Sequence, residues 1–249
     1  MDLQNNFVRL KNLLAILTQF YSKLPSQCIS CQSITCADSL LCRHCLDDWR
    51  QSADNLAWQD VSVLSQAQKS MQIHELDHLY CLAAYTPPFA QLITQYKFEK
   101  NLTVRTALQQ VLRESLNRLS PQQIKQFKQY DFFIPVPMHW SALWLRGFNQ
   151  SAWLTQQLSR HFNIPIINAL TKVRATKHQA RLSGGARRLH AANVYRVRPA
   201  YATGVMGKRL LLIDDVVTTG STLNSIATCL WAHQAKSVAA ATISWARKV

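Results

Sequence analysis

The chain has 249 residues, of which 48% are hydrophobic, so it can build a globular core and is not a disordered polybasic tail. Its 28 Lys and Arg residues against 13 Asp and Glu leave a formal net charge of +15. The imbalance lies after Asp131, where 15 basic residues face two acids, whereas 13 basic residues face 11 acids up to that point. We therefore expect the C-terminal part to meet an anionic partner such as phosphate groups, nucleic acid or a membrane surface.

Residues 1–25 are predicted to form one amphipathic helix, because six apolar residues recur there at spacings of three and four and Pro25 ends the pattern. Packing on the body of the protein is the favoured interpretation, and a membrane-surface or partner-binding helix is the alternative. No stretch approaches the roughly 20 apolar residues of a membrane-spanning helix. We expect no transmembrane segment and no secretory signal.

Residues 26–50 form a short cysteine-rich module with two Cys-x-x-Cys pairs. In a chain without an export signal such pairs are more often metal sites than disulfides. Two pairs complete the tetrahedral thiolate shell that Zn²⁺ prefers, and a segment with almost no core needs such a ligand to fold. The sequence predicts a structural zinc ion, with Cys36 and His44 as substitute ligands; free thiols or a redox pair are the alternative. The predicted ligands are Cys28, Cys31, Cys42 and Cys45.

The rest of the chain is predicted to form a connecting helix and loop at 51–78 and an α/β domain at 79–249. A helix after Pro121 links its first part to a region of regular alternation. Helical patterns cover 89–118, 149–162 and 222–234. Strand-like runs cover 79–85, 132–136, 164–170, 209–213 and 237–243. Strands that alternate with helices indicate a doubly wound parallel sheet.

The most informative segment covers residues 210–223, where an apolar strand is followed by Asp214, Asp215 and a loop of small residues that enters a helix. Backbone N–H groups of such a loop bind anions, and Gly220 allows a positive φ or the close approach of a phosphate. The acids repel phosphate and suit ribose hydroxyls or Mg²⁺. A phosphorylated ribose has both features, whereas a turn that binds nothing would leave two acids without a partner. The predicted ligand-binding residues are Val217, Thr218, Thr219, Gly220, Ser221 and Thr222.

This segment resembles the phosphoribosyl-pyrophosphate motif of type I phosphoribosyltransferases: an apolar strand, two acids, two apolar residues and Thr-Thr-Gly-x-Thr. The resemblance implies that Asp214 and Asp215 are the catalytic acids and hold the ribose 2′- and 3′-hydroxyls. It also implies that the loop holds the 5′-phosphate and that Mg²⁺ accompanies the pyrophosphate. No site for a base is evident, so the sequence leaves open an active phosphoribosyltransferase on an unidentified nitrogenous acceptor. A scaffold in which the zinc module and the N-terminal helix bind partners is the other alternative.

Further segments resemble the competence protein F family, as does a four-cysteine module ahead of a phosphoribosyltransferase-like domain. They are Asp131–His139, Arg146-Gly-Phe-Asn149-Gln150, Arg174-x-Thr176-x-x-Gln179 and the pair Arg187 and Asn193. This resemblance implies a role in natural transformation, with incoming single-stranded DNA as ligand and DNA-uptake or recombination proteins as partners. It implies a cytoplasmic location, with a peripheral position at the inner membrane as a further expectation.

The turn Pro135-Val136-Pro137 lies where type I phosphoribosyltransferases carry their pyrophosphate loop, and a rigid structural turn is the alternative. Arg146 could bind phosphate through two parallel hydrogen bonds. Asn149 could cap the next helix. His139 is a weak candidate for a general base, because a single His is more often structural.

The segment 172–198 is basic without a single acid, unlike an ordinary solvated face, which mixes both signs. It could close over pyrophosphate or follow a nucleic-acid backbone, and a solvated face is the alternative. Four aromatic residues nearby, Trp140, Trp144, Phe148 and Trp153, could stack on bases, although Trp153 suits a core position better. The predicted nucleic-acid-binding residues are Lys172, Arg174, Lys177, Arg181, Arg187 and Arg188.

Overall fold

A computed structural model describes most of the chain but not the predicted N-terminal helix. The described residues are 25–36, 40–71, 73–87, 89–98, 102–173 and 194–246. Residues 1–24 of the predicted helix lie outside them. So do five of the six predicted nucleic-acid-binding residues: Arg174, Lys177, Arg181, Arg187 and Arg188.

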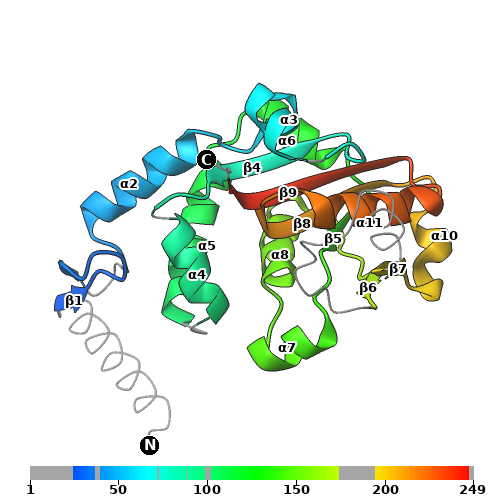
Figure 1. The fold of residues 1–249 in the computed structure, drawn as a ribbon. Helices are drawn as coiled ribbons and strands as arrows, with labels where there is room; N and C mark the ends of the chain where they lie inside the picture. Colours follow the sequence, from blue (N-terminus) through cyan, green and yellow to red (C-terminus); the bar gives the residue numbers. More distant parts are fainter. Residues whose placement is uncertain are drawn as a thin grey trace, which may run out of the picture.

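The centre of the fold is a five-stranded sheet with the order β3-β4-β9-β8-β5 (Figure 1). Neighbouring strands from β4 to β5 run parallel, as predicted, but β3 at the edge is antiparallel to β4. The prediction of helix and loop for 51–78 missed this edge strand, which is only two residues long. The strands are β3 Gln59–Asp60, β4 Leu79–Ala84, β5 Phe132–Pro135, β8 Arg209–Val217 and β9 Ser237–Trp245.

The predicted strand at 164–170 is wrong as a strand of this sheet. Pro165 has no N–H to donate, and only a single bridge joins Phe133 to Ile166. The chain instead forms β6 Leu170–Lys172, which pairs antiparallel with β7 Tyr195–Val197 in a separate two-stranded sheet. The basic segment therefore begins on this two-stranded sheet, outside the main sheet.

Both faces of the sheet are covered, which confirms the doubly wound α/β architecture. Leu211 and Ile213 of β8 belong to one apolar core, and Leu210 and Leu212 belong to the other. The first core contains residues of α2 Arg43–Asp54, α4 Phe89–Phe98, α5 Leu102–Asn117, α6 Pro121–Lys128 and α8 Gln150–Phe162. The second contains residues of the 3₁₀ turn Val61–Val63, α3 Ser65–Ser70, α10 Ala202–Val205 and α11 Ser221–Ala232.

The cysteine-rich module packs against the main body. It begins with the hairpin of β1 Pro25–Gln27 and β2 Ile34–Cys36, and its helix α2 crosses the predicted boundary at residue 50. Buried Trp49 of α2 lies in the same core as residues of α5. Arg50 Nε lies 2.9 Å from Glu114 Oε2 of α5, which adds a polar link. The module is therefore anchored through α2.

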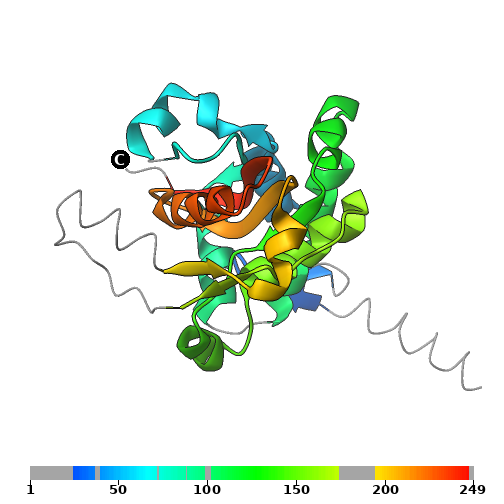
Figure 2. The same cartoon turned by 90° about the vertical axis from the view of Figure 1, so that its right-hand side faces the viewer.

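A short helix that the sequence did not predict, α7 Trp140–Arg146, stands out from the body below α8 (Figures 1 and 2). Its C-cap is Gly147, whose φ of +81° is a left-handed conformation that favours glycine. None of its residues is buried. Among the described residues, no helix is both long enough and apolar enough to cross a membrane.

Candidate functional site

A pocket of about 300 Å³ opens where β5 and β8 end and α8 begins. This volume is at the lower end of the range for small-molecule sites. The edge formed by the carboxyl ends of parallel strands is where open α/β sheets bind ligands. Charged side chains from four different parts of the chain line the pocket: Lys97, Arg146, Lys172, Asp214 and Asp215.

A smaller cavity of about 40 Å³ adjoins it, formed by the loop between β8 and α11. Gly220 is the N-cap of α11 with a φ of +75°, as the sequence predicts. The two cavities share Asp214 and Thr222, and the described residues that line the smaller one include no basic side chain. All six predicted loop residues line this cavity: Val217, Thr218, Thr219, Gly220, Ser221 and Thr222.

Asp214 of β8 is linked to the start of α8 by a hydrogen bond. Ser151 Oγ donates a hydrogen bond of 2.8 Å to Asp214 Oδ1, and the Asp215 N–H donates one of 2.9 Å to the same oxygen. Burial raises the pKa of Asp214 to about 7, and the charge of Asp215 acts in the same direction. This carboxyl can therefore change its charge near neutral pH.

Asp215 has a cationic partner that the sequence did not single out as a site residue. Lys97 Nζ at the end of α4 lies 2.9 Å from Asp215 Oδ2, and the two side chains are 21% and 13% exposed. β8 is predicted to end at 213, but it continues through both acids to Val217, while its pairing with β5 stops at Ile213. The acids therefore lie beyond the end of β5, within reach of α4 and α8.

The turn between β5 and α8 forms one wall of the pocket. Val136 and Pro137 line it, whereas Pro135 is the last residue of β5 and does not. Asn149 caps α8 as predicted: its Oδ1 accepts from the Ser151 N–H at 3.0 Å, and its Nδ2 donates to the Val136 carbonyl at 3.0 Å. Its side chain therefore holds the turn against the helix.

His139 and Arg146 mark the two ends of α7 and both line the pocket. His139 is the N-cap, because its Nδ1 accepts from the Ser141 N–H at 3.3 Å. This contact is a helix cap and does not itself indicate a general base. Arg146, in the last turn, brings a guanidinium group to the pocket, where the sequence expects a phosphate contact.

Lys172 lines the pocket, although the sequence assigns it to nucleic-acid binding. Its Nζ lies 5.5 Å from the centre of the Tyr195 ring, a cation–π distance. Burial lowers the pKa of Lys172, while the charge of Asp214 opposes that shift. Burial also raises the pKa of Tyr195 to about 12. Lys172 therefore adds a basic side chain to the lining of this pocket.

The four aromatic residues near this site divide into two pairs. Trp153 is buried, and Phe148 packs on Tyr96 with ring centres 4.9 Å apart, so this pair belongs to the core. Trp140 and Trp144 on α7 are 73% and 85% exposed. Only this second pair could stack on bases from solvent.

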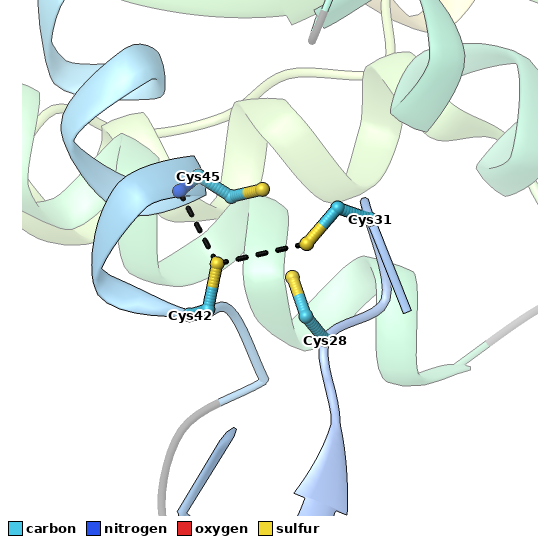
Figure 3. Close-up of side chains that lie close together, drawn as sticks. All are labelled: Cys28, Cys31, Cys42 and Cys45. Atoms are coloured by element: carbon cyan, nitrogen blue, oxygen red, sulfur yellow. Dashed lines mark hydrogen bonds between the residues drawn. The ribbon is translucent and has the colours of Figure 1, made fainter. Parts of the chain in front are cut away.

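The second candidate site is the cysteine cluster at the other end of the molecule (Figures 1 and 3). The sulfur atoms of Cys28, Cys31, Cys42 and Cys45 all lie within 4.8 Å of one another. Cys31 Sγ and Cys42 Sγ are 3.7 Å apart. Zinc–sulfur bonds of about 2.3 Å in a tetrahedron place two sulfurs about 3.8 Å apart, so the cluster fits the ion.

Hydrogen bonds and burial act differently on these thiols. A hydrogen bond from Ser33 lowers the pKa of Cys31 to about 6, and the Cys45 N–H lowers the pKa of Cys42. Burial raises the pKa of Cys45 to about 12. A bound cation would favour the thiolate of Cys45 as well. His44, a predicted substitute ligand, pairs instead with Asp48 at 3.2 Å, and the side chain of Cys36 lies outside the described part.

Comparisons with known proteins bear on the C-terminal part of the chain and on its family. Residues 149–248 match the phosphoribosyl transferase domain family. The chain is 37% identical to the DNA utilization protein YhgH of Escherichia coli O157:H7 over 161 residues, which are 64% of this chain and 68% of that protein. It is 34% identical to competence protein F of Haemophilus influenzae over 155 residues, 62% of this chain and 66% of that protein.

A more distant match is competence protein ComFC of Bacillus subtilis, 25% identical over 146 residues, which are 59% of this chain and 55% of that protein. The mostly parallel sheet, the loop after β8 and the four clustered cysteines are the features that the sequence associates with this family. The match to the DNA utilization protein extends over more than two thirds of that relative. The chain therefore belongs to the competence protein F family, with a phosphoribosyl transferase domain at residues 149–248.

Proposed function

We propose that this chain handles incoming single-stranded DNA during natural transformation and that its pocket binds phosphoribosyl pyrophosphate with Mg²⁺. The names of its relatives, a DNA utilization protein and two competence proteins, support the first part. A protein with this role works where DNA enters the cell, so we also propose a location on the cytoplasmic side of the inner membrane. DNA-uptake or recombination proteins are its proposed partners.

The arrangement of the two cavities supports the second part of the proposal most strongly. The loop cavity offers backbone N–H groups and hydroxyls at a helix N-terminus, which suits a 5′-phosphate. The adjoining pocket contains two carboxylates for ribose hydroxyls and three basic side chains for a diphosphate. Asp214 and Thr222 line both cavities, so one ligand can extend across them.

The two carboxylates of the pocket suit a Mg²⁺ ion that binds together with the phosphates of the ligand. Among the described residues, the four cysteines are the only group of three or more metal-ligating side chains within mutual reach, so the pocket has no protein cage for a cation. Mg²⁺ typically takes one or two carboxylates and completes its shell with water and substrate phosphates. Asp214 and Asp215 provide that number, and bound Mg²⁺ would neutralise part of the diphosphate charge.

Calorimetric titration with phosphoribosyl pyrophosphate and Mg²⁺ tests the pocket directly. Saturable binding that needs the diphosphate supports the proposal, and the lack of any binding would overturn it. A panel of purines, pyrimidines and other nitrogenous acceptors, scored by pyrophosphate release, tests whether the pocket also catalyses transfer. Release with one acceptor would favour a transferase, and binding without release would favour a sensing pocket.

The cysteine cluster is proposed to hold a structural Zn²⁺. Four protein sulfurs fill the tetrahedral shell and leave no position for a substrate. Cys28 and Cys45 are buried in the core shared with Trp49. The ion would therefore stabilise the way α2 packs, far from the ligand pocket.

The excess of positive charge supports a polyanionic ligand. Residues 132–213 contain no acid, and one small ligand needs only some of the basic residues in this part. Binding to single-stranded DNA should weaken steeply as salt rises, with a slope of about 0.7 for each phosphate contact. Fluorescence anisotropy of a labelled oligonucleotide at several salt concentrations measures this slope, and salt-insensitive or absent binding would contradict the DNA ligand.

The exposed Trp pair on α7 is expected to add base stacking to this binding. Replacing Trp140 and Trp144 together by alanine should weaken single-stranded DNA binding by about tenfold or more, since one stacked base contributes about 1–3 kcal/mol. The salt slope should stay unchanged, because no charge is removed. Leu145→Ala on the same helix, 71% exposed, is the matched control and should bind like the native protein. Equal affinity of the Trp variant and the control would argue against stacking.

Ligand binding in the pocket is expected to weaken as the pH falls. The pKa of Asp214 is raised to about 7, so this carboxyl is largely protonated at pH 6 and ionised at pH 8. If the ionised form holds the ligand, affinity for Mg²⁺ and phosphoribosyl pyrophosphate should drop about tenfold between pH 8 and pH 6. Calorimetry across this range, with correction for protonation of the ligand, measures the drop. Asp214→Asn should remove the dependence, and a flat native profile would contradict it.

A further inference from the structure

The first residue of α8, Gln150, is buried and belongs to the residues that line the pocket. Gln150 is 2% exposed, and its Nε2 has no hydrogen-bond partner among the described residues. Its neighbours on both sides are engaged: Asn149 Nδ2 donates to the Val136 carbonyl, and Ser151 Oγ donates to Asp214. Of these three consecutive residues, only Gln150 therefore has side-chain N–H groups without an acceptor in the described part of the chain.

A buried amide without a partner lowers stability, so its presence needs an explanation. Other buried polar atoms without a recorded partner occur on Trp49, Ser70 and Trp153, but these residues do not line the pocket. Gln150 differs from them because it lines the pocket, so a small rotation of its side chain would bring the amide to an acceptor bound there. Its position suits a ligand contact that forms only when the pocket is filled.

The distribution of charge indicates which part of the ligand this contact takes. The loop cavity, proposed for the 5′-phosphate, has no basic side chain among its described lining residues, and Gln150 does not line it. Lys97, Arg146 and Lys172 line the pocket together with Gln150. The group that remains for these cations is the diphosphate on the anomeric carbon of the ribose, whose oxygens accept hydrogen bonds.

We propose that Gln150 is a specificity-determining residue whose carboxamide N–H groups donate to the diphosphate of the bound ligand. The inference rests on the proposed phosphoribosyl pyrophosphate pocket and deepens it. Gln150 then helps the protein to distinguish a ribose 5-phosphate that carries a diphosphate from one that does not. Loss of the amide should weaken binding of the ligand that carries a diphosphate and leave binding of ribose 5-phosphate unchanged.

The test replaces Gln150 by methionine, which has a similar volume and no polar donor. The matched control is Trp153→Phe, which removes another unpaired N–H from the same helix outside the pocket. Binding of phosphoribosyl pyrophosphate, inorganic pyrophosphate and ribose 5-phosphate, each with Mg²⁺, is measured by calorimetry. Thermal unfolding of the ligand-free proteins is measured alongside.

For Gln150→Met we expect about tenfold weaker binding of both diphosphate ligands and less than a twofold change for ribose 5-phosphate, as for one lost hydrogen bond. The unfolding temperature without ligand should stay the same or rise by about 2–4 °C, because an unpaired buried amide is removed. The control should bind all three ligands like the native protein.

Three results would overturn the inference about Gln150. Unchanged diphosphate affinity would show that the amide makes no ligand contact. An equal loss for ribose 5-phosphate would place the contact on the sugar or its 5′-phosphate. A lower unfolding temperature for the ligand-free variant would show that the amide is structural. If the native protein binds none of the three ligands, the proposed function fails and the inference fails with it. If the native protein and the variant bind the diphosphate ligands equally well, only the inference about Gln150 fails.

Discussion

Replacing Asp214 by asparagine is expected to weaken binding of Mg²⁺ and phosphoribosyl pyrophosphate by about a hundredfold while making the ligand-free protein more stable at pH 8. The loss of binding follows because asparagine has no charge for the cation and is a weaker acceptor for ribose hydroxyls. The gain in stability follows from the pKa of Asp214, which is raised from its usual 3.8 to about 7 in the folded protein.

The folded protein keeps the Asp214 proton at pH values where the unfolded chain has lost it. The free energy of unfolding therefore falls as the pH rises from about 4 to about 7. At pH 8 the folded protein still carries the whole of this loss in stability, because Asp214 is then ionised in its buried position. Asparagine cannot ionise and avoids this loss, which should make the variant more stable by about 1–3 kcal/mol at pH 8. The difference should disappear at pH 4. Urea denaturation at both pH values measures it, and a less stable variant at pH 8 would contradict the raised pKa.

Asp215→Asn is the matched comparison, because the two acids should affect stability in opposite directions. Asp215 pairs with Lys97 at 2.9 Å, and Lys97 is only 21% exposed. Removing this partner leaves a poorly solvated ammonium group and should destabilise the protein by about 1–3 kcal/mol. Both variants should lose the ligand. If either one retained native affinity, that acid would have no part in holding it.

Removing the metal from the cysteine cluster is expected to lower the unfolding temperature by about 10 °C. Zinc present at a thousand times its dissociation constant stabilises the folded state by about 4 kcal/mol, and each kcal/mol shifts a domain of this size by about 2–4 °C. Cys28 and Cys45 belong to the same buried core as Trp49, so a disordered cluster should also expose this indole. Thermal unfolding with and without a chelator, together with Trp emission, measures both effects.

Cys45→Ser should lower the unfolding temperature as the chelator does. Elemental analysis of this variant should find less than one zinc per chain. Cys229→Ser is the matched control, because Cys229 lies outside the cluster and is partly buried. Its unfolding temperature and zinc content should match those of the native protein. A native protein that contains no zinc, or that is unaffected by the chelator, would contradict the proposed site. Point variants suit this test better than a deletion at residue 50, which would cut helix α2.

Most of the regular structure could be predicted because its signals are local. The apolar run of β8, its two acids and the loop that enters α11 are consecutive in the chain, so one pattern indicates strand, ligand edge and helix start. Asn149 as a helix cap follows from the residue type and its place before an amphipathic pattern. The predicted strand at 164–170 shows the limit of such signals. Its apolar content is typical of a strand, but Pro165 interrupts the ladder and only one bridge forms.

The side chains that contact the two acids could not be predicted in the same way. Lys97 and Ser151 contact Asp215 and Asp214, yet they lie far from them in the chain and belong to no motif that includes the acids. Helix α7 itself was also not predicted, because a seven-residue helix between two turns has too few residues to show a period. These features depend on which helix ends face the edge of the sheet.

The sequence by itself determined the α/β class and the location of the positive charge, and it predicted which four cysteines cluster and which loop lines the smaller cavity. Only the tertiary structure decided that Lys97 pairs with Asp215, that Lys172 lines the pocket and that the Nε2 of buried Gln150 has no hydrogen-bond partner within the described part of the chain. The physical reason is the strand order. The last two strands, β8 and β9, insert between β4 and β5, which brings the end of α4 and the start of α8 to the same edge. Local sequence patterns predict the helices and strands, whereas the order of the strands in the sheet decides which side chains come into contact.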